Sequence, residues 1–268
     1  MTTVRDIYQY IDEISPFSMQ ESWDNSGMLV GRWERQVSKV LVTLDITPEV
    51  IQEAHKMNAQ LIVSHHPLIF QPTKQVTDGA TDLVGQRILS LVEQGIAAIC
   101  CHTSWDSAPG GVNDVLAKLC GLQGELELLE QVGTTPDGTP YGIGRIGHLA
   151  VPMPLKDYLD LLRGSLEPNG LRCCDGGKLV HKVAVGGGSC GSMMELAVQA
   201  GCDTFVTGDL KYDHFLDAKM YGLNLIDAGH YPTEDPSMAV LGRKISRRFP
   251  ELEVRKSERH REVLCYRT

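Results

Sequence analysis

The chain has 268 residues, of which 42% are apolar and 22% charged, as in ordinary globular proteins of one large or two moderate domains. Its net charge of −9 argues against nucleic acid as the main partner, because phosphate binding needs a basic face. No stretch approaches the roughly 20 apolar residues of a membrane span, and residues 1–10 lack the layout of a signal peptide. We therefore expect a cytoplasmic protein without a membrane partner.

Eight cysteines are present, and none of them forms a Cys-x-x-Cys motif. Several adjoin apolar residues, as in Ile99-Cys100-Cys101. We expect them to remain thiols and to pack mainly as small hydrophobic residues. A zinc–thiolate site is the less favoured interpretation.

The first half of the chain alternates between strands and helices. The predicted elements are a strand at 39–42, a helix at 48–57 capped by Thr47, a strand at 59–64 followed by His65-His66, a helix at about 82–94 and a strand at 96–101 followed by His102. Largely apolar strands separated by helix-length crossovers are typical of parallel α/β sheets.

The region from Gly121 to His181 has a different pattern. Antiparallel strands are predicted at 127–132 and 141–151, on either side of a strong turn signal at 133–140. An amphipathic helix is predicted at 154–165. We place a domain boundary near residue 122.

The second half repeats the order of the first. An offset of 143 residues places Lys39-Val40-Leu41-Val42 on Lys182-Val183-Ala184-Val185. A helix at about 192–200, a helix through Lys219 and a strand at 223–227 follow. We favour an internal duplication, with two similar three-layer α/β domains related by a pseudo-dyad. The predicted domains are 1–122 with 235–268, and 123–234; the closing segment is predicted as a helix capped by Asp235-Pro236 and a strand at 262–266.

Potential metal ligands follow three predicted strands. His102 and Asp106 have the same spacing as His230 and Glu234, and His65-His66 follow another apolar run. Ligands of open parallel sheets bind beyond the carboxyl ends of the strands, so we expect one metal site at the domain interface. The predicted ligands are His65, His66, Asp106, His230 and Glu234, with Glu234 bridging.

Imidazole and carboxylate groups suit zinc, iron or manganese, and five or six of them suit two divalent ions that activate a water molecule as the nucleophile. His102 is either a further ligand or a general acid or base. We expect the other five histidines to have no ligand role; they are His55, His148, His181, His214 and His260.

Two loops stand beside these candidates. The segment Gly186-Gly187-Gly188-Ser189 either exposes N–H groups to an anion or makes a tight turn. The segment 207–214 either lines the same cleft or is a solvated loop.

The chain resembles the Nif-three-like family, whose members are often labelled GTP cyclohydrolase 1 type 2 homologues. The motifs that carry the resemblance run in order along the chain: Trp23-Asp24-Asn25-Ser26-Gly27-Met28-Leu29-Val30-Gly31, Ser64-His65-His66-Pro67-Leu68, His102-Thr103-Ser104-Trp105-Asp106, Gly208-Asp209-Leu210-Lys211-Tyr212 and Asp227-Ala228-Gly229-His230-Tyr231-Pro232-Thr233-Glu234. Asp213 separates Tyr212 from His214, where the family more often has Lys-Tyr-His.

The resemblance implies two α/β domains with a dinuclear metal site and a toroidal homohexamer. It assigns the metal to the five predicted ligands and leaves His102 nearby, as the best candidate for proton transfer. We expect a metal-dependent hydrolase that acts on a nucleotide or a phosphorylated small molecule. The alternative is a metal-binding regulatory or scaffold ring protein without physiological turnover.

Overall fold

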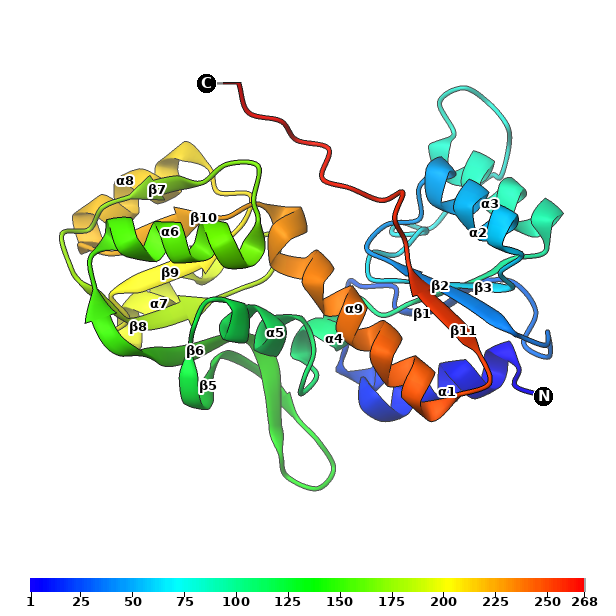
Figure 1. Ribbon diagram of the computed structural model, residues 1–268, viewed down its shortest axis with the longest axis horizontal. Helices are drawn as coiled ribbons and strands as arrows, with labels where there is room; N and C mark the ends of the chain where they lie inside the picture. The colour runs from blue at the N-terminus through cyan, green and yellow to red at the C-terminus, as the bar shows by residue number, and fades with distance from the viewer. Residues whose placement is uncertain (268) are drawn as a thin grey trace. The chain divides into compact units, whose positions relative to one another are not determined.

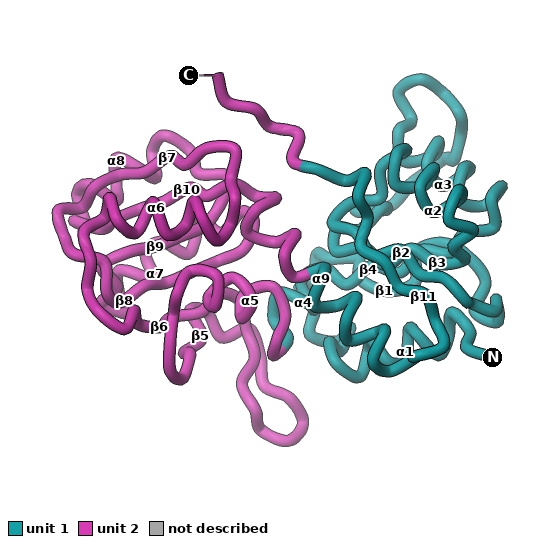
Figure 2. Tube along the Cα trace, in the orientation of Figure 1, with its two compact units in different colours: residues 1–108, 238–261 teal, residues 109–237, 262–268 magenta. Residues whose placement is uncertain are grey.

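The computed structural model describes residues 1–267 (Figure 1). Figure 2 shows two compact units: unit 1 comprises Met1–Ala108 and Met238–Arg261, and unit 2 comprises Pro109–Ser237 and the segment from Glu262. The chain therefore passes between the units at 108/109, 237/238 and 261/262, whereas the sequence placed two boundaries, near 122 and 234, and assigned the segment from Glu262 to the first domain. Helix α5 (Val112–Leu119) lies between the two positions of the first boundary, and its Leu116 packs in a core of unit 2.

Unit 1 contains a five-stranded sheet in the order β1-β4-β3-β2-β11. Its strands are β1 (Gly27–Val30), β2 (Lys39–Thr43), β3 (Leu61–Ser64), β4 (Ala97–Cys100) and β11 (Glu253–Lys256). Four are parallel, and β1 pairs antiparallel with β4 at the edge. The three central strands, β2 to β4, are almost wholly buried, which explains their near-continuous apolar sequence.

Helices cover both faces of the unit 1 sheet. They are α1 (Val4–Ile14), the short 3₁₀ turn η1 (Phe17–Met19), α2 (Pro48–Met57), α3 (Leu83–Gln94), α4 (Thr103–Ser107) and the part of α9 (His230–Arg248) that belongs to unit 1. Residues of α2 and α3 pack with Leu41 and Ile62 on one face. Alternate strand residues such as Val42 face Gly242 of α9 on the other.

The capping signals in the sequence explain where α2 begins and ends. The Thr47 hydroxyl accepts the N–H of Val50, and Pro48 occupies the first turn. Asn58 closes the helix in the left-handed conformation at φ 56°.

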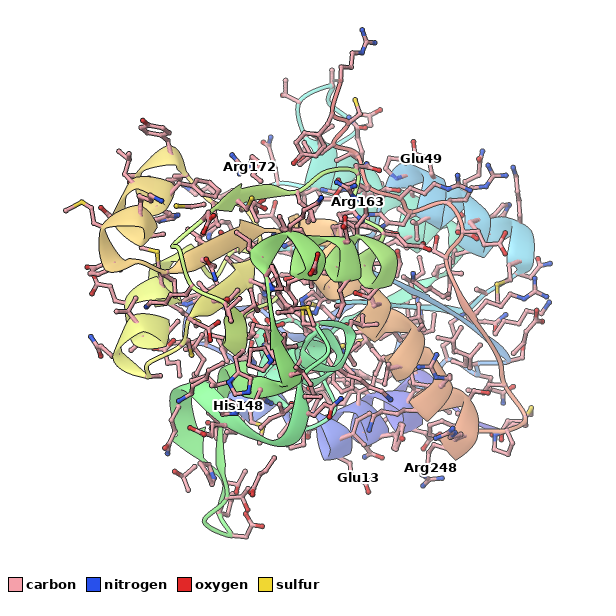
Figure 3. All side chains as sticks on the ribbon, turned by 60° about the vertical axis from the view of Figure 1, so that its left-hand side comes forward. Glu13, Glu49, His148, Arg163, Arg172 and Arg248 are labelled. Atoms are coloured by element: carbon pink, nitrogen blue, oxygen red, sulfur yellow. The ribbon has the colours of Figure 1, made fainter. Side chains whose placement is uncertain are left out.

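Unit 2 contains a six-stranded mixed sheet in the order β5-β6-β8-β9-β10-β7. Its strands are β5 (Gln123–Thr134), β6 (Pro140–Met153), β7 (Arg172–Cys174), β8 (Val180–Val185), β9 (Thr204–Thr207) and β10 (Asn224–Asp227). Only β8, β9 and β10 are mutually parallel. Arg172 on the edge strand, labelled in Figure 3, contacts the Asp227 carboxylate at the end of β10.

The unit 2 sheet also lies between two helix layers. Val183, Val206 and Ile226 share one face with α5 and with Tyr158 and Leu162 of α6 (Leu155–Leu166). The neighbouring strand residues, such as Phe205, face α7 (Met194–Gln199), which follows the 3₁₀ turn η2 (Gly191–Met193), and α8 (Tyr212–Tyr221). Each unit is therefore a three-layer α/β structure, as predicted.

The strand registers of the two units agree with an internal repeat. Val40 pairs with Leu61 between β2 and β3, and Val183 pairs with Thr204 between β8 and β9. Both members of the pair differ by the same 143-residue offset that aligned the sequences. The order β4-β3-β2 in one sheet also matches β10-β9-β8 in the other.

Two predictions near the C-terminus were wrong. The last strand is β11, and residues 262–266 form none, since Val263 and Leu264 are exposed and have no sheet face to cover. Helix α9 begins at His230, before the predicted cap at Asp235-Pro236. Gly229 reverses the chain at φ 87° directly before this helix, and Pro236 is accommodated inside it.

Among the described residues, no helix combines the length and apolarity that a membrane span requires.

Candidate metal centre

His65 and His66 directly follow β3 in unit 1, where their backbone N–H groups donate to the carbonyl oxygens of Thr43, the last residue of β2, and of Leu44, which follows it. The His65 ring is fully buried, and its Nδ1 lies 3.0 Å from the carbonyl oxygen of Cys101. A carbonyl oxygen only accepts hydrogen bonds, so Nδ1 carries the proton and Nε2 carries the lone pair. Nε2 is therefore the nitrogen with which His65 would bind a metal.

A carboxylate orients the His66 ring in the same way. His66 Nδ1 lies 2.9 Å from Asp45 Oδ1, and the other oxygen of Asp45 lies 3.1 Å from Nε2 of His260. Burial alone raises the pKa of Asp45, but hydrogen bonds from His260 and His66 outweigh it, and the pKa lies below its ordinary value. Asp45 is thus a carboxylate anion that fixes the orientation of His66.

His102 occupies the N-cap position of α4, just beyond the end of β4. Its Nδ1 lies 2.8 Å from Asp24 Oδ1, and its backbone N–H donates to the hydroxyl of Ser26 at 2.9 Å. Thr103 donates to the second oxygen of Asp24 through its N–H and its hydroxyl. Burial raises the pKa of Asp24, but the bonds from His102 and Thr103 outweigh it and lower the pKa overall.

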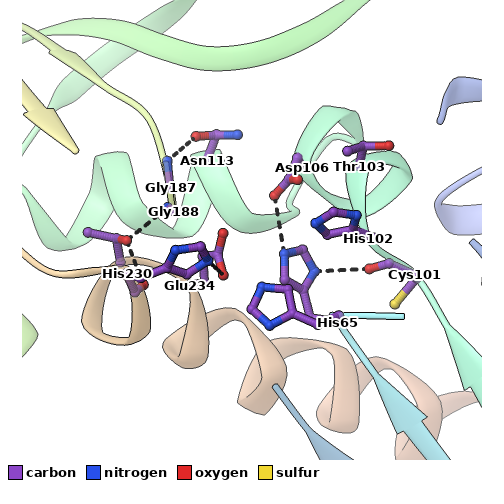
Figure 4. Close-up of polar contacts among 12 residues, drawn as sticks. His65, Cys101, His102, Thr103, Asp106, Asn113, Gly187, Gly188, His230 and Glu234 are labelled. Atoms are coloured by element: carbon purple, nitrogen blue, oxygen red, sulfur yellow. Dashed lines mark hydrogen bonds and ion pairs between the residues drawn. The ribbon is translucent and has the colours of Figure 1, made fainter. Parts of the chain in front are cut away.

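The three histidines of unit 1 form one group. Each of His65, His66 and His102 offers a ring nitrogen, and these nitrogens lie within 4.8 Å of one another. Asp106, in α4, lies with Oδ1 3.6 Å from Nε2 of His65 (Figure 4). Imidazole and carboxylate donors at these distances can hold a divalent ion.

In unit 2, His230 and Glu234 lie one helical turn apart at the start of α9. Nδ1 of His230 lies 2.7 Å from Asp209 Oδ2, and Nε2 lies 3.0 Å from Glu234 Oε2. With the proton on Nδ1, two acceptor atoms face each other at Nε2 and Oε2. A proton or a cation must lie between two such acceptors, which fits a metal-binding role for this pair.

Glycines allow the backbone to approach this pair closely. A Cβ on Gly188 would lie 2.1 Å from Oε1 of Glu234 and 3.1 Å from Nε2 of His230. Gly188 also adopts φ +66°, in the left-handed region that favours glycine. A Cβ on Gly208 would meet the backbone of Gly229 and His230 at 2.8 Å. These positions therefore have no room for a side chain while His230 and Glu234 keep their places.

The Gly186–Ser189 loop uses most of its N–H groups within unit 2. Gly187 donates to Asn113 Oδ1 and Gly188 donates to the Thr233 hydroxyl, both at 3.0 Å (Figure 4). Gly186 donates to the carbonyl oxygen of Val206. This pattern favours the tight-turn interpretation over an anion site.

Three orienting carboxylates and one histidine were missed from the sequence; they are Asp24, Asp45, Asp209 and His260. Asp45 and Asp209 follow β2 and β9 by two residues, so their position at strand ends was a usable signal. His260 was predicted to have no ligand role, and its ring contacts the carboxylate of Asp45, which also contacts His66. His214 accepts the N–H of Lys211 at the start of α8 instead.

The His-x-x-x-acid spacing has a helical origin in both units. His102 and Asp106 flank the first turn of α4, and His230 and Glu234 flank the first turn of α9, so each acid returns to the side of its histidine. His102 follows the last residue of β4 by two positions, whereas His230 follows that of β10 by three, because Gly229 is an extra residue. Relative to the strands that precede them, the two copies of the motif are thus displaced by one residue.

The fold and these groups define a protein of two three-layer α/β units that carries histidine and carboxylate groups suited to divalent metals. The family model Duf34/NIF3 (NGG1p interacting factor 3) matches residues 2–262. The chain belongs to this family.

Curated and solved relatives span nearly the full chain. A protein of Clostridium perfringens named GTP cyclohydrolase 1 type 2 homolog is 35% identical over 247 residues, 92% of each chain. One of the same name from Clostridium acetobutylicum is 33% identical, covering 90% of this chain and 89% of its own. A crystal structure of a Bacillus cereus protein related to NIF3 has a TM-score of 0.89 at 25% identity, covering 99% of both chains.

Proposed function

We propose that the protein is a divalent-metal-dependent hydrolase that acts on a nucleotide or a phosphorylated small molecule. We further propose that it binds two ions of zinc, iron or manganese through His65, His66, Asp106, His230 and Glu234. The observation that carries the proposal is shared by all of its candidate histidines. In each ring Nδ1 faces a protein acceptor, either a carbonyl or a carboxylate oxygen.

This arrangement is typical of metal-binding histidines. An acceptor on one nitrogen fixes the tautomer and the ring orientation, and raises the basicity of the other nitrogen. A bound divalent ion would supply Lewis acidity and lower the pKa of a water molecule toward neutrality. The carboxylates of Asp24, Asp45 and Asp209 would hold the rings in place while that chemistry proceeds.

His102 is proposed as the proton-transfer residue. Its bond to Asp24 leaves Nε2 as the basic nitrogen, as in other oriented histidine bases. The same nitrogen lies close enough to His65 and His66 to act as a ligand. Metal content of His102→Ala separates the two roles: a proton-transfer residue can be removed without loss of metal, and a ligand cannot.

The name of the curated relatives makes GTP the first substrate to test. Metal-loaded protein would be assayed with GTP and a panel of phosphoesters, alongside metal analysis. Two ions per chain are expected, and Glu234→Gln and Asp106→Asn should lose metal and turnover together. His148→Ala is the matched control, because His148 lies on β6 against His181 and contacts none of the candidate ligands of its unit.

Two stoichiometric ions without turnover of any substrate in the panel would count against the hydrolase. Such a result would favour the regulatory or scaffold alternative. We also propose the toroidal homohexamer that the family resemblance implies, which light scattering of the purified protein would test.

A further inference from the structure

Two exposed aromatic side chains stand beside the histidine group of unit 1. Trp23 is 55% exposed and Phe70 is 44% exposed, and their ring centroids lie 5.9 Å apart at an interplanar angle of 59°. Single exposed aromatics are common in proteins. Two that touch each other form a small exposed apolar patch, which acquires meaning from what lies beside it.

Both rings also contact the ring of His102. The centroid of Trp23 lies 5.9 Å from that of His102, and the centroid of Phe70 lies 6.2 Å from it, both at steep angles. His102 in turn lies 5.2 Å from His65 and 5.5 Å from His66. The aromatic pair therefore borders the candidate metal ligands directly.

Hydrogen bonds hold the segment that carries Trp23. Its neighbour Asp24 has a fully buried side chain that bonds to His102 and Thr103. The Asn25 amide donates to the carbonyl oxygen of Ile69 at 2.5 Å, which ties this segment to the one that carries Phe70. The residues next to both exposed rings are thus held by hydrogen bonds, Asp24 beside Trp23 and Ile69 beside Phe70.

A fixed, exposed aromatic pair is suited to stacking. Flat rings bind to Trp and Phe faces with little loss of conformational entropy, and base–aromatic stacking contributes about 1–3 kcal/mol per base. We propose that Trp23 and Phe70 form the subsite for a planar aromatic ring of the substrate, a nucleobase or a similar heteroaromatic ring. This inference rests on the proposed function, since it assigns to the hydrolase a substrate with such a ring next to the bond that reacts.

The test measures binding and needs no turnover. Full-length zinc-loaded protein would be titrated calorimetrically with AMP, with GMP and with ribose 5-phosphate, which lacks the base. Trp23→Ala is expected to weaken binding of both nucleotides by roughly 5- to 150-fold, the equivalent of one stacked base, and to leave the affinity for ribose 5-phosphate within about twofold of wild type. Trp23→Phe should restore most of the loss.

Val92→Ala is the matched control, because Val92 is 61% exposed on α3 and is replaced without removing an aromatic ring. Equal binding of nucleotides and ribose 5-phosphate by the wild type would overturn the subsite, as would Trp23→Ala binding nucleotides at full strength. A changed sedimentation coefficient in Trp23→Ala with nucleotide binding intact would instead identify the pair as a contact with a second copy. Base-dependent binding that needs Trp23, without turnover of any substrate, would support the subsite while overturning the hydrolase.

Discussion

Replacing Gly188 by alanine should weaken metal binding far more than it weakens the fold. The added Cβ would lie 2.1 Å from Oε1 of Glu234. That oxygen is the far end of a flexible side chain, so it can move away while the backbone stays in place. The predicted ligand is displaced, and its partner His230 loses the acceptor that faces Nε2.

The loss of fold stability and the loss of metal affinity in Gly188→Ala have separate causes. A left-handed alanine costs about 1–2 kcal/mol, partly offset by the lower entropy of the unfolded chain. The expected fall in Tm is therefore only a few degrees, at roughly 2–4 °C per kcal/mol for a chain of this size. Removing a group that only orients a ligand lowers metal affinity by about 10- to 100-fold in other metal sites, and displacement of Glu234, itself a proposed ligand, should lower it by at least as much.

The matched control is Gly201→Ala. Gly201 has φ +73°, close to the +66° of Gly188, but a Cβ there would meet nothing within 4 Å. Both variants should lose similar thermal stability by calorimetry, and only Gly188→Ala should lose zinc to a competing chromophoric chelator. Equal zinc affinity in the two variants would refute the reasoning, whether both affinities matched the wild type or both were reduced.

Three further predictions concern Asp24, the cysteines and Tyr158. Asp24 has a pKa below its ordinary value because hydrogen bonds from His102 outweigh the effect of burial. Its carboxylate therefore stabilises the fold above the unfolded pKa of about 4, and this contribution is lost as the pH falls. Urea unfolding of the metal-free protein should thus show a smaller loss of stability between about pH 5 and about pH 3 in Asp24→Asn than in the wild type. Cys173 and Cys265 are exposed, whereas Cys120 is buried with its pKa raised to about 12, so a thiol reagent should label the first two in native protein and Cys120 only after unfolding. The hydroxyl of the fully buried Tyr158 donates to the carbonyl oxygen of Cys120 at 3.1 Å, so Tyr158→Phe should lower the free energy of unfolding by about 1 kcal/mol and leave metal content unchanged.

Local signals in the sequence predicted most elements of the fold. Helix α2 begins and ends where Thr47, Pro48 and Asn58 indicate, and the alternation of strands and helices identified the α/β class. The strand predicted at 262–266 was wrong because a short run of apolar residues, here Val263 to Tyr266, resembles a strand whether or not a sheet is there to bury it. Tertiary context alone distinguishes that segment from β11.

The candidate site was harder to complete from sequence. His65, His66 and His102 stand out because histidines at the ends of apolar runs are uncommon. Asp24 does not stand out, since a carboxylate in a loop is usually solvated. The place of Asp45 beyond β2 indicates an edge of the sheet but not its partner, and only the folded chain brings each of the two to an imidazole nitrogen. Spacing along the chain carries no information about such pairs, which depend on strand order.

The protein acceptors on Nδ1 have a consequence for how the proposed site would acquire a metal. Each ring is oriented by Cys101, Asp45, Asp24 or Asp209, so ion uptake requires no rotamer search and no folding step, in contrast to zinc fingers. Metalation can then follow folding as a separate event. Imidazole and carboxylate groups suit several first-row ions, so the ion bound at the proposed site would depend on cellular supply at the time of loading as well as on the geometry of the site.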